Sequence, residues 1–209
     1  LGSNLQTCKE LPVLIKLIDA NKDLSVQVHP DDAYARQYEH GSQGKTEMWY
    51  VLDARKDAKL VYGFRKELTR QQIRNSIEDQ TIEKYLLKKH IEKDDVFFIK
   101  AGTVHALGAG ALVAEIQQNS NLTYRLYDYN RMDKNGKLRE LHIEKALDVA
   151  DRKAQQEPRQ PMRVLKYRRG CAIELLCRCR YFQVERLLVN TERNRQMAVV
   201  QSREDSFQV

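Results

Sequence analysis

The sequence has few cysteines and no long apolar run, and these absences exclude several classes of protein. No apolar stretch approaches the roughly 20 residues that a helix needs to span a membrane. Residues 1–10 also lack the apolar segment of a secretory signal. We therefore predict a cytoplasmic protein with no membrane partner. The four cysteines are Cys8, Cys171, Cys177 and Cys179. Three of them cluster in one short segment, and no second cluster offers the spacing of a zinc site, so we predict free thiols.

The charge of the chain is basic, but no recognised nucleic-acid motif accompanies it. The formal net charge is +7, and the lysines and arginines are spread along the chain and mixed with acids. The densest basic stretch is residues 162–180, and it contains no nucleic-acid-binding motif. We predict no nucleic-acid partner, because a basic balance is equally compatible with an anionic small molecule.

Short strands dominate the expected secondary structure. Residues 24–29 alternate, with Leu24, Val26 and Val28 on one face and Gln27 and His29 on the other. Further strands are predicted at residues 12–18, 47–52, 59–64, 95–100, 112–117, 122–129, 172–177, 182–188 and 197–200. Many short strands predict a mainly β fold, either a barrel or a sandwich with helical decoration.

Three segments are expected to be helical. A short helix follows Pro30 and ends near His40, and a last helix carries its apolar stripe between Ile143 and Ala150. A helical insertion is predicted at about residues 68–89, where Thr69 and Gln72 fit a capping box. The pairs Ile73/Ile77 and Ile82/Leu86 have the spacing of one helix face.

The domain organisation follows from a change in composition after residue 150. Residues 151–165 are polar, contain Pro158 and Pro161, and are predicted to be a linker. It separates a larger segment at residues 1–150 from a second segment of strands at residues 166–209. The chain has no initiating Met and ends on residues that resemble the start of a strand, so we expect parts of a longer protein beyond both ends.

Four residues at separate positions could together hold a metal ion. Gln27 and His29 project from one face of a strand, Glu47 starts an apolar strand, and His105 follows a glycine turn among small residues. Each has an ordinary alternative: a hydrogen-bonded histidine, a solvated strand end, or an imidazole on a backbone carbonyl. As a set they offer the nitrogen and oxygen donors that zinc accepts, and they equally suit non-haem iron.

Arg125 lies between apolar and aromatic residues of a predicted strand. A buried guanidinium needs an anion, which could be a substrate phosphate or an internal acid such as Glu115. The neighbouring tyrosines, Tyr124, Tyr127 and Tyr129, are expected to pack rather than to act in catalysis.

Four separated segments resemble, in order, the signature of bacterial type I mannose-6-phosphate isomerases of the cupin superfamily. The resemblance runs from about Leu11 to Ala150 and weakens afterwards, although residues 181–187 are similar to the opening of the family's second cupin half. The segments are LIDA (17–20) with LSVQVHPDD (24–32), KTEMWYV (45–51), AGTVHAL (101–107) and EIQQNSNLTYRLYDY (115–129).

This resemblance implies a cupin-type jelly-roll barrel with a helical insertion, followed by part of a second cupin-like half. It also implies one Zn²⁺ per catalytic domain, bound inside the barrel mouth by four residues, with Arg125 in the active site and Lys45 close to the metal ligand Glu47. The implied metal ligands are Gln27, His29, Glu47 and His105.

The implied reaction interconverts mannose 6-phosphate and fructose 6-phosphate through a cis-enediol(ate). The implied partner is therefore a small-molecule hexose phosphate substrate. A base must shuttle the proton, and the candidates are Lys45, Glu115 and a water on the metal. A non-catalytic sugar-phosphate-binding cupin or truncated paralogue is the main alternative, and an iron-dependent cupin oxygenase is the second. The oligomeric state is left open.

Overall fold

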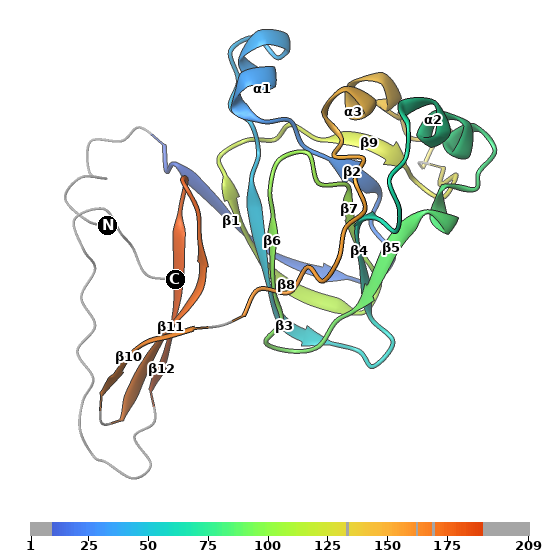
Figure 1. The fold of residues 1–209 in the computed structure, drawn as a ribbon. Helices are drawn as coiled ribbons and strands as arrows, with labels where there is room; N and C mark the ends of the chain where they lie inside the picture. Colours follow the sequence, from blue (N-terminus) through green and yellow to red (C-terminus); the bar gives the residue numbers. More distant parts are fainter. Residues whose placement is uncertain (1–9, 133, 162, 169, 190–209) are drawn as a thin grey trace.

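Two antiparallel sheets face each other and form the barrel of this computed structural model (Figure 1). The structure describes residues 10–132, 134–161, 163–168 and 170–189; Cys8 and the strand predicted at 197–200 lie outside them. One sheet has the order β1 (Val13–Ala20), β8 (Ala111–Gln118), β3 (Glu47–Ala54), β6 (Val96–Ile99). The other has the order β5 (Leu86–His90), β4 (Lys59–Phe64), β7 (His105–Leu107), β2 (Val26–Val28), β9 (Tyr124–Tyr127).

Alternation along the strands sorts side chains between the inside and the outside of the barrel. In the first sheet Trp49 is paired with Glu115, and their neighbours Met48 and Ile116 are paired on the opposite face. Met48 and Ile116 belong to an outer apolar cluster, whereas Trp49 belongs to the cluster between the sheets. The strand pattern therefore decides which residues can reach the interior.

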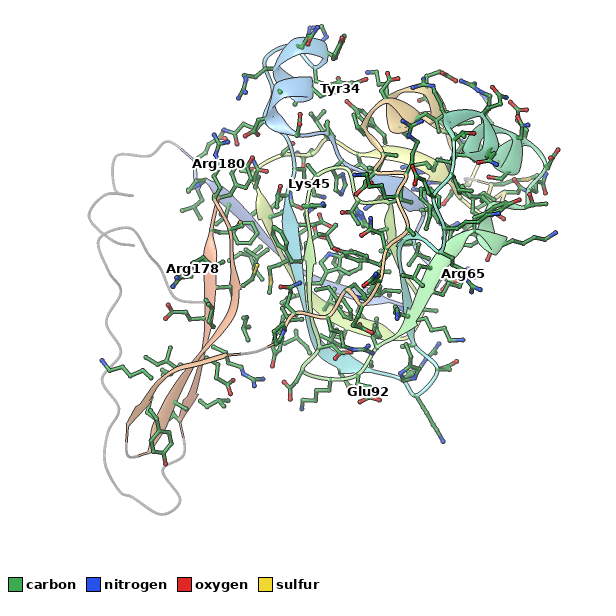
Figure 2. All side chains as sticks on the ribbon, in the orientation of Figure 1. Tyr34, Lys45, Arg65, Glu92, Arg178 and Arg180 are labelled. Atoms are coloured by element: carbon green, nitrogen blue, oxygen red, sulfur yellow. The ribbon has the colours of Figure 1, made fainter. Side chains whose placement is uncertain are left out.

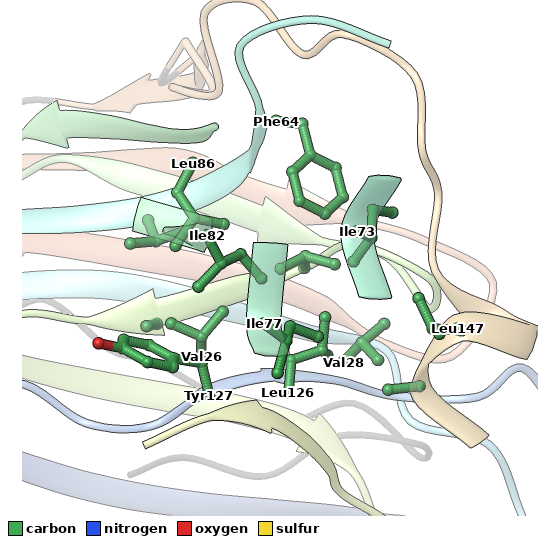
Figure 3. Packing of buried hydrophobic residues seen from close by; sticks show 14 of the residues in the cluster. Val26, Val28, Phe64, Ile73, Ile77, Ile82, Leu86, Leu126, Tyr127 and Leu147 are labelled. Carbon is green, nitrogen blue, oxygen red and sulfur yellow. The ribbon is translucent and has the colours of Figure 1, made fainter. Parts of the chain in front are cut away.

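Helices cover the outer face of the second sheet. α2 (Arg70–Glu78) and α3 (Ile143–Val149) pack there, while α1 (Asp32–Tyr38) stands at one end of the barrel (Figure 1). The capping box predicted for Thr69 and Gln72 is present. Figure 3 shows the resulting core, in which Val26 and Val28 anchor β2 as expected; the labelled partners are Phe64, Ile73, Ile77, Ile82, Leu86, Leu126, Tyr127 and Leu147.

The predicted helical insertion is wrong in its second half. α2 ends at Glu78, a single 3₁₀ turn follows at Ile82–Lys84, and Leu86–His90 forms the edge strand β5. Gln80, with a φ of 56°, turns the chain through the left-handed region directly after α2. Leu86 then pairs with Phe64 of β4, so long-range sheet pairing overrides the helical spacing of Ile82 and Leu86.

A third sheet packs against the outside of the first one. Its strands are β10 (Arg163–Arg168), β11 (Cys171–Arg178) and β12 (Gln183–Val189), in that order. Leu176 and Cys177 of β11 share a buried cluster with Met48, Val96 and Ile116 of the barrel. Cys171, Cys177 and Cys179 are free thiols, as predicted.

The stretch expected to be a linker lies along the barrel. The backbone N–H of Gln155 donates to the carbonyl of Phe64, and that of Gln160 donates to the carbonyl of Val96. β10 begins at Arg163, within the range assigned to the linker. Among the described residues, no helix is both long enough and apolar enough to cross a membrane.

Candidate metal centre and active site

Three strands bring two imidazoles and one carboxylate together inside the barrel. His29 directly follows β2, Glu47 begins β3 and His105 begins β7. Their exposed fractions are 1%, 0% and 0%. The Nε2 atom of His29 lies 3.4 Å from Oε2 of Glu47, and the Nε2 atom of His105 lies 3.2 Å from Oε1. These three predicted residues therefore form one buried cluster with the spacing of a metal site.

The outer nitrogen of each histidine ring is held by a backbone carbonyl. Nδ1 of His29 donates to the carbonyl of Leu122 at 2.8 Å, and Nδ1 of His105 donates to that of Thr103 at 2.8 Å. Because a carbonyl only accepts, both rings carry their proton on Nδ1 and turn the lone pair of Nε2 toward Glu47. Metal-ligating histidines are oriented in the same way.

Burial adjusts the charge of the cluster. It lowers the pKa of His29 to about 4, so the ring is neutral near pH 7. Burial alone would raise the pKa of Glu47, but attraction to the imidazolium forms of His29 and His105 outweighs burial and holds that pKa well below its usual range. Neutral imidazole and ionised carboxylate are the states in which these groups bind a metal.

The donor atoms of the cluster are chemically suited to a zinc ion. Nε2 of His29 and Oε1 of Glu47 are buried and have no hydrogen bond among the described residues, whereas Oε2 of Glu47 faces Nζ of Lys45 at 3.0 Å. Buried polar atoms in proteins nearly always have a partner. Ligand atoms at about 2.0–2.1 Å from a tetrahedral zinc ion lie about 3.3 Å apart, close to the spacing of this cluster. The residues therefore fit a zinc ion, and two histidines with one carboxylate would also accept iron.

Gln27 supplies the fourth predicted group. It is paired with His105 across β2 and β7, and its side-chain amide lies 3.4 Å from Nε2 of His105. A rotation of the amide by about 180° exchanges its nitrogen and its oxygen. In that orientation Gln27 presents an oxygen donor beside the nitrogen of His105.

A buried charge network extends from the cluster. Lys45, at 4% exposure, places Nζ 3.0 Å from Oε2 of Glu47 and 3.9 Å from Oε1 of Glu115. Glu115 also accepts hydrogen bonds from Nε1 of Trp49 at 3.0 Å and from Nζ of Lys16 at 3.1 Å. Figure 2 shows Lys45 near the end of the barrel that carries α1. The structure thus brings Lys45 and Glu115 to the cluster, as predicted.

Sequence reasoning missed Lys16. Its Nζ atom donates to Gln117 at 2.6 Å as well as to Glu115, and its side chain is 37% exposed. A lysine inside the otherwise apolar run Val13–Ile18 was the available signal, because a charged group in such a strand requires an anionic or polar partner.

Arg125 lies on the other side of β2 from His105. Its strand β9 pairs Arg125 with Gln27, and its guanidinium donates to the carbonyl of Glu140 at 2.7 Å. Nε of Arg125 is buried without a partner among the described residues. Burial, followed by the nearby charge of Arg139, lowers the pKa of Arg125. The alternative pairing with Glu115 is wrong, since Glu115 is paired with Lys16 instead.

The tyrosines of this region are packing residues, as expected. Tyr124 and Tyr127 are buried in the core cluster beneath the helices, and Tyr129 packs against it. The hydroxyl of Tyr124 donates to Glu39 at 2.6 Å, which ties β9 to the end of α1.

Comparison with known proteins identifies relatives of this chain. Residues 3–54 match the model of the family described as "phosphomannose isomerase type I, catalytic domain". The mannose-6-phosphate isomerase ManA of Bacillus subtilis is 48% identical over 140 residues, which are 67% of this chain and 44% of that protein. The probable mannose-6-phosphate isomerase GmuF of the same organism is 50% identical over 141 residues, or 68% and 44% of the two chains.

The fold has a counterpart among solved structures. The crystal structure of the mannose 6-phosphate isomerase from Bacillus subtilis superposes with a TM-score of 0.79 and 38% identity, covering 86% of this chain and 56% of that one. The predicted mainly β, cupin-type fold is confirmed by this likeness. The chain spans about 44% of the length of the curated relatives it matches.

Proposed function

We propose that this chain, which is related to the type I mannose-6-phosphate isomerases and shares their cupin fold, interconverts mannose 6-phosphate and fructose 6-phosphate. The observation that carries the proposal is the buried cluster of His29, Glu47 and His105 with Lys45 only 3.0 Å from Glu47. Metal donors and a proton-transfer group in contact are the minimum equipment for this reaction.

The metal proposed is one zinc ion held by four residues of the catalytic core: Gln27, His29, Glu47 and His105. When bound, zinc supplies a Lewis acid that polarises the carbonyl and hydroxyl oxygens of the opened sugar. The protein's own contribution is the buried, preoriented donor set, because Leu122 and Thr103 hold both rings with Nε2 inward.

The reaction moves one proton between C2 and C1 of the sugar. A base removes the proton from C2, the electron pair of that bond forms a C1–C2 double bond, and the C1 oxygen takes up a proton. Return of the proton to C1, with loss of the C2 hydroxyl proton, gives the ketose. We assign the shuttle to Nζ of Lys45, which is buried beside the ligand Glu47.

Glu115 has a different role in this proposal. Both of its oxygens already accept hydrogen bonds, one from Trp49 and the other from Lys16, and Lys45 approaches within 3.9 Å. A carboxylate with these partners holds the two lysines in place more readily than it removes a proton. We therefore treat Glu115 as a positioning residue and Lys45 as the base.

Arg125 is proposed to stabilise the negative charge of the substrate. It lacks a carboxylate partner among the described residues, and its buried Nε lacks any hydrogen bond there. A guanidinium in this state has donors free for the phosphate or for the enediolate.

The test is a coupled assay for fructose 6-phosphate formation together with zinc analysis of the same protein. Zinc-dependent turnover is expected. Arg125→Ala should lower turnover by about 100-fold with zinc content intact, the usual cost of removing one charge-stabilising donor. Arg36→Ala, an exposed arginine on α1, is the matched control. Full turnover in Arg125→Ala would remove Arg125 from the mechanism, and bound zinc without any turnover in the unsubstituted protein would indicate a binding module.

The predicted domain organisation remains a proposal: a catalytic core at residues 1–150, a linker at 151–165 and part of a second cupin-like domain at 166–209. The contacts of residues 155 and 160 with the barrel support a linker that is packed rather than free. The cytoplasmic location remains a prediction from composition.

A further inference from the structure

We propose that Tyr181, in the turn between β11 and β12, is a positioning residue for the loop that carries Lys45. The expected effect on turnover rests on the proposed function, whereas the contacts themselves do not. Tyr181 belongs to the third sheet, outside the barrel, and none of the motifs that predicted the active site includes it. The third sheet is therefore part of the catalytic unit.

The connection runs through one carboxylate. The hydroxyl of Tyr181 donates to Oδ2 of Asp32, the first residue of α1, at 2.9 Å. The other oxygen, Oδ1, accepts the backbone N–H of Gly44 at 2.9 Å and the side-chain amide of Gln118 at 3.1 Å. Asp32 thus joins the third sheet to the residue immediately before Lys45.

Each backbone N–H around Lys45 is fixed. Oε1 of Gln118 accepts the N–H of Thr46 at 2.8 Å, and the N–H of Lys45 donates to the carbonyl of Pro30 at 3.0 Å. Gly44 is pressed against the start of α1, where an added Cβ would lie 2.4 Å from the carbonyl carbon of Asp31. The loop therefore has little freedom as long as Asp32 keeps its orientation.

These hydrogen bonds orient Asp32 and also favour its ionised form. Burial would raise its pKa, but the hydrogen bonds from Tyr181, Gln118 and Gly44 outweigh burial and lower it. Tyr181 is the partner of Oδ2 among the described residues, so its removal frees that oxygen to turn toward solvent. Oδ1, which accepts from both Gly44 and Gln118, then loses its fixed position.

The third sheet is itself held firmly enough to act as an anchor. Arg186 of β12 forms ion pairs with Glu174 at 2.7 Å and with Asp94 of the barrel at 2.5 Å, and it donates to the hydroxyl of Tyr50 at 2.5 Å. Phe182, next to Tyr181, packs against the outer cluster that contains Met48. A rigid anchor matters because misplacing a catalytic group by about 1 Å can cost about 100-fold in rate.

The experiment compares Tyr181→Phe with the unsubstituted protein. Loss of one hydrogen bond in the network should lower kcat by about three- to tenfold. KM and zinc content should stay unchanged, because neither the metal donors nor Arg125 contacts Tyr181. Hydrogen exchange at the Gly44 amide should accelerate by a similar factor. Tyr38→Phe, which removes an exposed tyrosine hydroxyl on α1, is the control and should change neither quantity.

A second variant tests whether Asp32 transmits the effect. Asp32→Ala removes the oxygens that accept from Tyr181, Gly44 and Gln118, so it should lower kcat at least as much as Tyr181→Phe. The double variant should be no worse than the more damaging single one. Additive losses, or unchanged exchange at Gly44 in Tyr181→Phe, would overturn the inference. If the unsubstituted protein lacked isomerase activity, the proposed function would fail, while exchange at Gly44 would still decide the contact network.

Discussion

Removal of the proposed zinc ion should lower the thermal stability of this protein by a measurable amount. The donors of His29, Glu47 and His105 come from three strands, so a bound ion cross-links both sheets of the barrel. The unfolded chain has no such preformed site. At a free zinc concentration of about 100 times Kd, binding to the folded state alone adds about 2.7 kcal/mol. For a chain of this size, each kcal/mol moves the unfolding midpoint by about 2–4 °C, which predicts a shift of about 5–11 °C.

The measurement is thermal unfolding of chelator-treated protein with and without added zinc. His105→Ala should abolish the zinc-induced shift in the unfolding midpoint. The cavity that this substitution creates changes the midpoint of the zinc-free protein as well, and the comparison with and without zinc separates the two effects. His90→Ala is the matched control, because His90 is partly exposed on β5 and belongs to no metal cluster among the described residues. Equal midpoints with and without zinc, or a full shift in His105→Ala, would refute the assignment of the metal site.

Three further predictions concern packing, charge and backbone geometry. Met48→Ala, at a fully buried position between the barrel and the third sheet, should cost about 2–5 kcal/mol of unfolding free energy in urea, and a cost near zero would argue against that interface. Arg74 and Arg70 hold the pKa of Glu144 at about 2, below its ordinary value of 4.5, so its stabilising contribution is complete above pH 4.5 and is lost as pH falls toward 2. Glu144→Gln should therefore flatten that part of the curve of urea midpoint against pH, and an unchanged curve would contradict the assignment. Gly44→Ala should cost about 1–3 kcal/mol of unfolding free energy in the same assay, because the added Cβ would collide with the backbone of Asp31. Unchanged stability would show that the loop can move away from α1.

The sequence by itself determined most of the strands, β5, β7 and β10 excepted, and the chemistry of the metal donors. Alternation in Leu24–His29 separated the apolar anchors Val26 and Val28 from Gln27 and His29, and the structure keeps that separation. The reason is local, since the side-chain period of a strand does not depend on its neighbours. The donors of His29, Glu47 and His105 could be listed for the same reason, because residue type alone specifies which atoms can bind a metal.

The tertiary structure decided which of these strands are neighbours and what each charged group contacts. Glu115 is paired with Lys16 rather than with Arg125, because β1 lies beside β8 in one sheet and β9 lies in the other. Leu86–His90 became a strand for a similar reason, since β4 offered an open edge that helical spacing alone could not reveal. The contact of Tyr181 with Asp32 joins residues 149 positions apart. Contacts of this kind depend on how sheets pack, and a local pattern contains no information about that packing.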